Sequence, residues 1–307
     1  MQLFLDILTG ITLPILGLVA LGYGVQKRYG FDIPTLTRLQ IYVLGPVALI
    51  WFPSAAKLPL STSWPVVWFS LAQCVFLFGL GWVVAKSLNM SRNVTGLMAV
   101  AAMFSNSGNY GIPLIQLTFP DDYLLYQTVI FSLHSILVVP LMLFALSGST
   151  EGHFSIWRAL FGTPLLPAAA LGFVLKGFDI TLPQVLAIPL RLTSQAFTPM
   201  ALLLLGMQLA AIQVRIERTP VVVGLILRMA VAPTSAWLLA TLLGFPPNLI
   251  AFLVVSAAVP AGVLIAIFAS EFNVGPELAS MLVFISTVIS ALTVTGWIYA
   301  VRYAGLQ

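Results

Sequence analysis

The sequence predicts an all-α membrane protein with ten transmembrane helices, arranged as two inverted repeats of five, whose fourth and ninth helices are broken near the membrane midplane. Three observations predict this fold. The composition is strongly apolar, the apolar residues fall into ten runs, and short motifs recur at matching places in the two halves.

The composition excludes a soluble globular protein. Hydrophobic residues make up 60% of the 307 residues and charged residues only 7%, with a mean hydropathy of +1.06, whereas soluble domains carry about 25% charged residues. The net charge of +4 comes from single or paired basic residues, which form no stripe for nucleic acid. The one cysteine, Cys74, excludes an internal disulfide framework and a cysteine-based zinc site.

The chain contains ten apolar segments. Each is about as long as a transmembrane helix, which needs about 20 apolar residues. The first follows no basic residues, so we expect a membrane span there rather than a cleaved signal. The predicted segments are residues 3–25, 33–55, 64–86, 94–119, 123–146, 159–176, 184–211, 219–243, 247–270 and 278–301. A polar linker at 147–158 divides them into a first repeat, 1–146, and a second repeat, 159–307.

The basic residues predict the orientation, because Lys and Arg collect in cytoplasmic loops. With the amino terminus outside the cytoplasm, the connections on the non-cytoplasmic side hold only Lys57, Lys176 and Arg302. The cytoplasmic connections then hold seven basic residues, Lys27, Arg28, Lys86, Arg92, Arg158, Arg215 and Arg218. We therefore expect an integral plasma (inner) membrane protein with both termini on the non-cytoplasmic side and a cytoplasmic linker.

A weak internal repeat relates the two halves. Leu21-Gly22-Tyr23 is echoed by Leu171-Gly172-Phe173, and Pro46-Val47-Ala48-Leu49 by Pro199-Met200-Ala201-Leu202. Pro113 precedes Pro260 by 147 residues. Because five spans are an odd number, the second copy enters the membrane from the opposite side, an arrangement that is typical of secondary transporters.

The fourth segment carries the most polar and glycine-rich stretch within any apolar run, residues 104–114, with sequence FSNSGNYGIPL. Proline removes a helical hydrogen bond and each glycine costs about 1 kcal/mol relative to alanine, so we expect the helix to break there. The matching stretch of the ninth segment is residues 256–262, SAAVPAG. Such breaks must line a protein-bounded or water-filled cavity, and the helix ends that restart there favour an anion.

These motifs resemble the auxin efflux carrier family of secondary transporters, which includes plant auxin carriers and bacterial dicarboxylate permeases. The likeness covers the whole chain. It rests on residues 106–114 (NSGNYGIPL), Pro46-Val47-Ala48-Leu49, Leu182-Pro183, residues 199–206 (PMALLLLG), Pro260 and residues 286–290 (STVIS).

The resemblance implies that helices 4 and 9 cross at their prolines. Helices 1, 2, 6 and 7 would form a scaffold that often dimerises, and helices 3–5 and 8–10 a transport domain that moves like an elevator. It implies a small organic anion as substrate, a homodimer in the lipid bilayer, no cofactor and no metal. The candidate substrate-binding residues are Asn106, Asn109, Gly111, Pro113, His134, Pro260 and Ala261, with Gln73 and Arg228 as candidates for support or coupling.

Several polar residues within the membrane keep two interpretations. His134, near the midplane, is a candidate for substrate contact or proton coupling, or packs through hydrogen bonds. Arg228 complements an anion or extends toward the cytoplasmic surface. Gln73, Gln195 and Gln208 line a cavity or join helices. The third segment has no carboxylate around Gln73, where plant carriers of this family have an acidic residue.

Three functions fit this pattern: a carrier of small organic anions, auxin-like or dicarboxylate; a sodium-coupled symporter of the bile acid type; and a membrane sensor that binds ligand without transport. Carboxylates are absent from both predicted breaks, which favours proton coupling or uniport over sodium coupling. The sequence contains no G-x-S-x-G, H-E-x-x-H or phosphate-cradling motif, so we expect no enzymatic activity.

Overall fold

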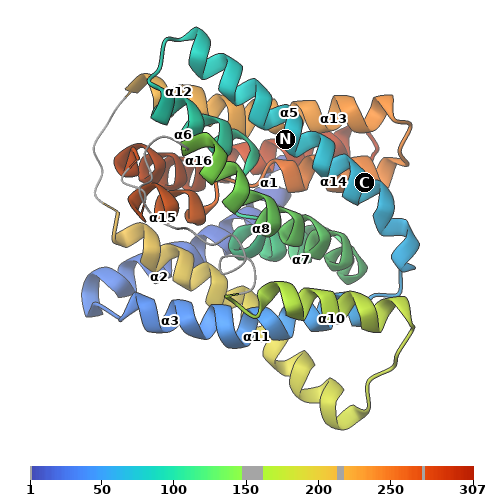
Figure 1. Cartoon of the computed structure of the whole chain (residues 1–307). Coiled ribbons are helices and arrows are strands. Elements are labelled where there is room, and N and C mark those ends of the chain that lie inside the picture. The colour runs from blue at the N-terminus through green and yellow to red at the C-terminus, as the bar shows by residue number, and fades with distance from the viewer. Residues whose placement is uncertain (1, 147–161, 213–217, 272–273) are drawn as a thin grey trace.

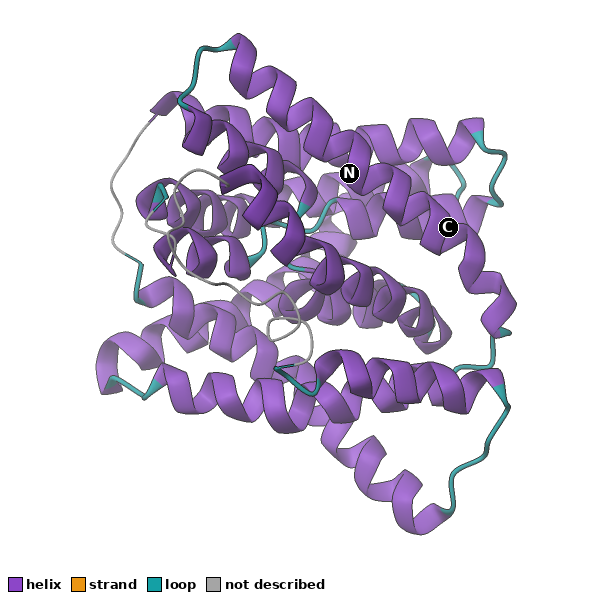
Figure 2. Cartoon of the chain, viewed as in Figure 1, coloured by secondary structure: helices purple, strands orange, loops and turns teal. Residues whose placement is uncertain are grey.

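The computed structural model describes residues 2–146, 162–212, 218–271 and 274–307. Over this part the chain is helical, with loops only at short connections and interruptions (Figure 2) and one isolated β-bridge. The elements of the first half are α1 (Gln2–Ile7), η1 (Leu8–Thr12), α2 (Leu13–Tyr29), α3 (Ile33–Leu39), η2 (Gln40–Leu44), α4 (Gly45–Ala55), η3 (Leu60–Ser63), α5 (Trp64–Ser87), α6 (Arg92–Met103), η4 (Ser107–Gly111), α7 (Ile112–Thr118), η5 (Asp121–Tyr123) and α8 (Leu124–Leu146). Those of the second half are α10 (Leu165–Gly177), α11 (Gln184–Ala210), α12 (Arg218–Ile226), η6 (Leu227–Val231), α13 (Ala232–Leu242), α14 (Pro247–Ala257), α15 (Val263–Glu271) and α16 (Pro276–Tyr303).

The all-helical membrane class is confirmed. Seven continuous helices in the described residues are long and apolar enough to cross a membrane, and α10 and α14 are shorter apolar helices. The count of ten spans stays a prediction. The predicted linker at 147–158 lies outside the described residues, as do Arg158 and Arg215.

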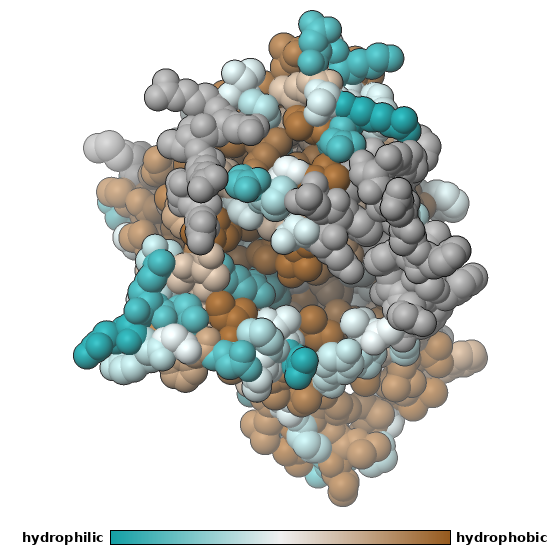
Figure 3. Space-filling model, turned by 60° about the vertical axis from the view of Figure 1, so that its left-hand side comes forward, coloured by the Kyte–Doolittle hydropathy of each residue, from teal (hydrophilic) through white to brown (hydrophobic). Residues whose placement is uncertain are grey.

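Many large hydrophobic side chains lie on the outside of the helices. Trp68, Val75, Val185 and Leu242 are each exposed by more than 60% in the protein alone, and apolar residues cover much of the surface (Figure 3). An apolar surface of this extent is unusual for a soluble monomer and is suited to contact with lipid.

The helices form two groups in space, which also contact each other. In Figure 1, α2, α3, α10 and α11 lie together in the lower part of the view, α5, α6 and α12–α16 lie in the upper part, and α7 and α8 lie between them. In the lower group, α2 packs against α11 and α4 packs against α10. A Cβ atom on Gly22 would lie 2.1 Å from the Leu203 carbonyl oxygen, and one on Gly172 would lie 2.5 Å from the Leu49 carbonyl oxygen. Glycine at both positions lets the backbones touch, as is common between membrane helices.

Four five-residue π-helical turns interrupt the described helices. These turns are η1, η2, η4 and η6, and a proline follows the end of each by two residues, namely Pro14, Pro46, Pro113 and Pro233. Proline has no N–H and its ring collides with the carbonyl four residues earlier, so a wider turn before it relieves the collision. One carbonyl freed in this way, that of Met229, accepts a hydrogen bond from Trp297 Nε1 at 3.0 Å.

Candidate binding site at the two helix breaks

The first break separates α6 from the helix that restarts as η4. Phe104 has extended backbone angles, and η4 begins at Ser107 and continues into α7 with Pro113 in its first turn. The interruption lies within the stretch that the sequence predicts to be broken. Asn and Ser compete with helical hydrogen bonding through their side chains, and the proline ring suits only the start of a helix, so the local sequence favours a restart here.

The second break separates α14 from α15 and pairs with the first. Ser105 and Ala261 form an antiparallel β-bridge. The Asn106 N–H donates to the Pro260 carbonyl at 2.8 Å, and the Gly262 N–H donates to the Phe104 carbonyl at 3.2 Å. The two interrupted helices therefore meet at their breaks and satisfy part of each other's unpaired backbone.

Neighbouring helices brace this pairing through buried side chains. Gln127 of α8 donates from Nε2 to the Ser107 carbonyl at 2.8 Å and accepts from the Ser256 hydroxyl at 2.9 Å, which joins the two breaks. From α16, Ser286 Oγ accepts from the Ala261 N–H at 3.1 Å, and Ser290 Oγ lies 2.9 Å from the Tyr110 hydroxyl. All three side chains from α8 and α16 are fully buried, so these contacts hold the breaks in a dry interior.

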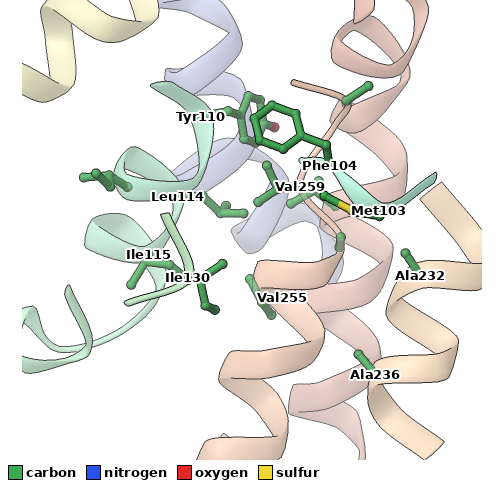
Figure 4. Packing of buried hydrophobic residues seen from close by; sticks show 14 of the residues in the cluster. Met103, Phe104, Tyr110, Leu114, Ile115, Ile130, Ala232, Ala236, Val255 and Val259 are labelled. Atoms are coloured by element: carbon green, nitrogen blue, oxygen red, sulfur yellow. The ribbon is translucent and has the colours of Figure 1, made fainter. Parts of the chain in front are cut away.

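Close packing at the breaks depends on glycine at two positions. A Cβ atom on Gly262 would lie 2.3 Å from the Phe104 ring, and one on Gly111 would lie 2.5 Å from Gln127 Nε2. Hydrophobic side chains fill the remaining space: Figure 4 shows Phe104, Tyr110 and Val259, which come from separate segments, within one packed cluster.

The central cavity lies on one side of the first break and has a volume of about 130 Å³. Residues Phe104 to Asn109 line it together with Phe131, Ser135, Val263, Leu264 and Ile267, and facing helices contribute Thr37, Gln40, Ile41, Gly45, Leu165, Phe197, Leu204 and Gln208. No charged side chain is among these described residues. The walls are mainly apolar with a cluster of neutral polar groups.

Three amides at this cavity have buried polar atoms without a hydrogen-bond partner. They are the Asn106 Nδ2, both polar atoms of the Gln40 amide and the Gln208 Oε1. Asn106 comes from the first break, Gln40 from η2 and Gln208 from α11. A buried polar atom without a partner costs about 1–3 kcal/mol, so three amides that meet in one cavity indicate a site for a polar ligand.

The central cavity opens toward the end of the molecule where α2 meets α3. A cavity of about 700 Å³ at this end, the α3-end cavity, shares Thr37, Gln208, Val263 and Ile267 with it. On the opposite side, Thr198 of α11 donates a hydrogen bond to Gln116 of α7. A cavity of about 480 Å³ beyond that bond, the α4-end cavity, shares no lining residue with the central cavity. Among the described residues, the central cavity therefore shares its lining with the α3-end cavity and not with the α4-end cavity.

Comparison with known proteins points to membrane transport. Residues 150–298 match the family described as "Membrane transport protein". A protein of Rhizobium meliloti (strain 1021) named "Putative malonate transporter" is 24% identical over 315 residues, which cover 97% of each chain. Both similarities support the resemblance to the auxin efflux carrier family of membrane transporters.

A much smaller rear cavity, of about 30 Å³, lies behind the breaks. It holds most of the ionisable and amide candidates. His134 Nδ1 lies 3.4 Å from Ser105 Oγ and 3.2 Å from Ser107 Oγ, and its ring packs on Phe104. Gln73 Nε2 donates to the Ala232 carbonyl and to Ser235 Oγ, and so joins α5 to α13.

Arg228 also lines the rear cavity and is 3% exposed. Its guanidinium donates to backbone carbonyls of both breaks, so its side chain does not extend to the cytoplasmic surface. Arg228 is not among the residues that line the central cavity.

The structure places the predicted site residues of this protein in three groups. Asn106 and Asn109 line the central cavity. Gly111, Pro113, Pro260 and Ala261 belong to the backbone that forms the breaks and are absent from its lining. His134, Gln73 and Arg228 lie at the rear cavity. The prediction thus found the polar break but did not separate its two sides.

Sequence reasoning missed Gln40 and Gln127, and left open whether Gln208 lines a cavity. Gln40 lies in a span that is far from the breaks in sequence, and only helix packing brings it to the cavity that Asn106 lines. Gln127 has a weak signal in the sequence: it is a polar residue in an apolar span, and such residues are costly in a membrane unless they bond to a partner.

Proposed function

We propose that this protein carries a small organic anion across the membrane and binds it in the central cavity. The observation that carries the proposal is the convergence of the unpartnered amides of Asn106, Gln40 and Gln208 on that cavity. Amide N–H groups of Asn106 and Gln40 donate to a carboxylate, and the helix that restarts at Ser107 directs the positive end of its dipole toward the same place.

Alternating access completes the proposed mechanism. The central cavity connects with the α3-end cavity, and the α3 end is cytoplasmic in the predicted orientation. This arrangement corresponds to an inward-open state. The proposed scaffold contains α1–α4, α10 and α11, and carries Gln40 and Gln208. The proposed transport domain carries Asn106. Sliding of the domain past the scaffold, as an elevator, would break the Gln116–Thr198 bond and open the α4-end cavity to the site. A homodimer through the scaffold helices is part of this proposal.

The matching contacts of the two halves support the inverted repeat on which this mechanism rests. Gly22 packs on α11 near Pro199-Met200-Ala201-Leu202, and Gly172 packs on α4 at Pro46-Val47-Ala48-Leu49. These are the two motif pairs by which the sequence relates the halves. The glycine motif of each half packs against or beside the proline motif of the other half.

The chemistry of the cavity walls limits the class of substrate that we expect. A neutral, largely apolar lining solvates one carboxylate more readily than two, since each buried charge needs its own hydrogen-bond donors. We therefore expect a monovalent carboxylate with an apolar body to be favoured over a dianion, although a relative bears the name of a malonate transporter.

The test is solid-supported-membrane electrophysiology with radiolabelled uptake, on purified protein in liposomes. Indole-3-acetate, aliphatic monocarboxylates, malonate and malate serve as substrates, with and without sodium and proton gradients. Asn106→Ala is expected to weaken apparent affinity about 10- to 100-fold, the range for a lost hydrogen bond to a charged group. Gln184→Ala, an exposed glutamine at the start of α11, is the matched control.

Any of three results would contradict the proposal. Unchanged kinetics in Asn106→Ala would remove the central cavity as the site. Saturable binding in detergent with no flux of any anion in liposomes would instead support a membrane sensor. Uptake that stops when choline replaces sodium would support a symporter of the bile acid type.

A further inference from the structure

Arg228 makes an unusual set of contacts for a buried charge. Its Nε donates to the Val259 carbonyl at 3.0 Å, and one terminal nitrogen donates to the carbonyls of Ala102 at 3.1 Å and Met103 at 3.3 Å. The other terminal nitrogen donates to the Ala257 carbonyl. No carboxylate of the described residues lies within 4 Å of it, so backbone oxygens alone balance the guanidinium.

These carbonyls lie where two helices end. α6 ends at Met103 and α14 ends at Ala257, so each presents carbonyls without helical partners. Each helix end also carries about −0.5 of a charge from its dipole, and two such ends come to about one negative charge. One guanidinium, whose planar fork holds five N–H donors, matches this charge and bonds oxygens of both helices at once.

The same groups bind coupling cations in other transporters with broken helices. There, unwound backbone carbonyls and the carboxyl-terminal ends of half-helices coordinate sodium or respond to protons. In this protein the guanidinium of Arg228, a residue of η6, already bonds to such oxygens at both breaks.

We propose that Arg228 is a built-in cation that takes the place of a coupling cation at the two breaks, so that substrate transport is independent of sodium. This rests on the proposed carrier function. Arg228 acts as a positioning residue: it holds the ends of α6 and α14 together and thereby fixes the restart at Ser107 that faces the central cavity. Its side chain lies at the rear cavity and does not touch the substrate.

The first test measures the unfolding temperature of purified protein in millimolar choline, sodium or guanidinium chloride at equal ionic strength. Wild type is expected to unfold at the same temperature in all three salts. Arg228→Ala is expected to unfold at a lower temperature in choline and to regain part of the loss in guanidinium or sodium, which enter the vacated position. Arg302→Ala, at the end of α16, is the control for loss of one positive charge.

The second test repeats the comparison with uptake in liposomes. Wild-type uptake is expected to be equal in sodium and choline. Arg228→Ala is expected to lose at least about tenfold in choline, and to recover part of it in guanidinium or sodium. A purely structural role would lower uptake equally in every salt, so this result or a sodium requirement in wild type would overturn the proposal.

Two further variants cover the case in which Arg228→Ala does not fold. Arg228→Gln keeps amide donors without charge, and Arg228→Lys keeps the charge with fewer donors. Arg228→Lys is expected to unfold at the higher temperature of the two, and equal temperatures would overturn the proposal. If wild type carries none of the anions, the carrier function fails, while the unfolding temperatures still decide the role of Arg228.

Discussion

The two helix breaks pair with each other but differ in chemistry. The first, Phe104 to Asn109, contributes a continuous stretch to the central cavity, including the unpartnered Asn106 Nδ2. The second contributes only apolar residues just beyond it, Val263, Leu264 and Ile267. Its own backbone groups bond to the first break and to Ser286.

Similar backbone interruptions can therefore have different roles within one protein. The first break presents a polar atom that has no hydrogen-bond partner. The second break holds the first in place, and the residues just beyond it complete the apolar wall of the central cavity. Changes at the second break should therefore act mainly on stability, and changes around the central cavity mainly on affinity.

The largest effect is expected at the second break. In Gly262→Val the new side chain collides with the Phe104 ring and the Ser105 carbonyl, and overpacking of this kind costs about 1–3 kcal/mol or more. The β-bridge should be lost, with a lower unfolding temperature and no measurable uptake. Gly296→Val is the control, since no atom lies within 4 Å of the Cβ position at Gly296. Normal stability in Gly262→Val would show that the pairing of the breaks is not needed.

The next effect is expected at the residue that joins the two breaks. Gln127→Leu removes the hydrogen bonds to the Ser107 carbonyl and from the Ser256 hydroxyl, at about 1–3 kcal/mol for a buried group that is left unsatisfied. The unfolding temperature should fall clearly, and uptake with it. Gln184→Leu, a change at an exposed glutamine at the start of α11, should change neither. An equal response of the two variants would deny Gln127 its bridging role.

The fold was more predictable than the site, for physical reasons. Apolar length and composition determine which segments suit a membrane, and the glycine, asparagine and proline of residues 104–114 favour a break within any one helix. These are local properties. The partners of Arg228, and the cavity that both Gln40 and Asn106 line, arise from the packing of helices that are distant in sequence, and single residues carry no local sign of them.

The unpartnered amides should separate stability from affinity. Gln40→Leu removes two buried polar atoms that have no partner, so the free protein is expected to gain about 1 kcal/mol of stability. The same change removes a donor to the substrate and should weaken affinity about tenfold. Unfolding temperature and uptake kinetics measure the two effects, with Gln184→Leu as control. Loss of stability without loss of affinity would make Gln40 a structural residue.

The smallest effect on affinity is expected at His134, which lies beside the first break but on its rear side. Its ring nitrogen is within hydrogen-bond distance of Ser105 and Ser107, while its side chain is absent from the central cavity lining. His134→Gln keeps a polar group near both hydroxyls and is expected to change apparent affinity less than about threefold, or about 0.7 kcal/mol. The measurement is the same uptake assay, beside Asn106→Ala. A loss in His134→Gln as large as that in Asn106→Ala would place substrate or proton chemistry at the rear of the break and remove the division between its two sides.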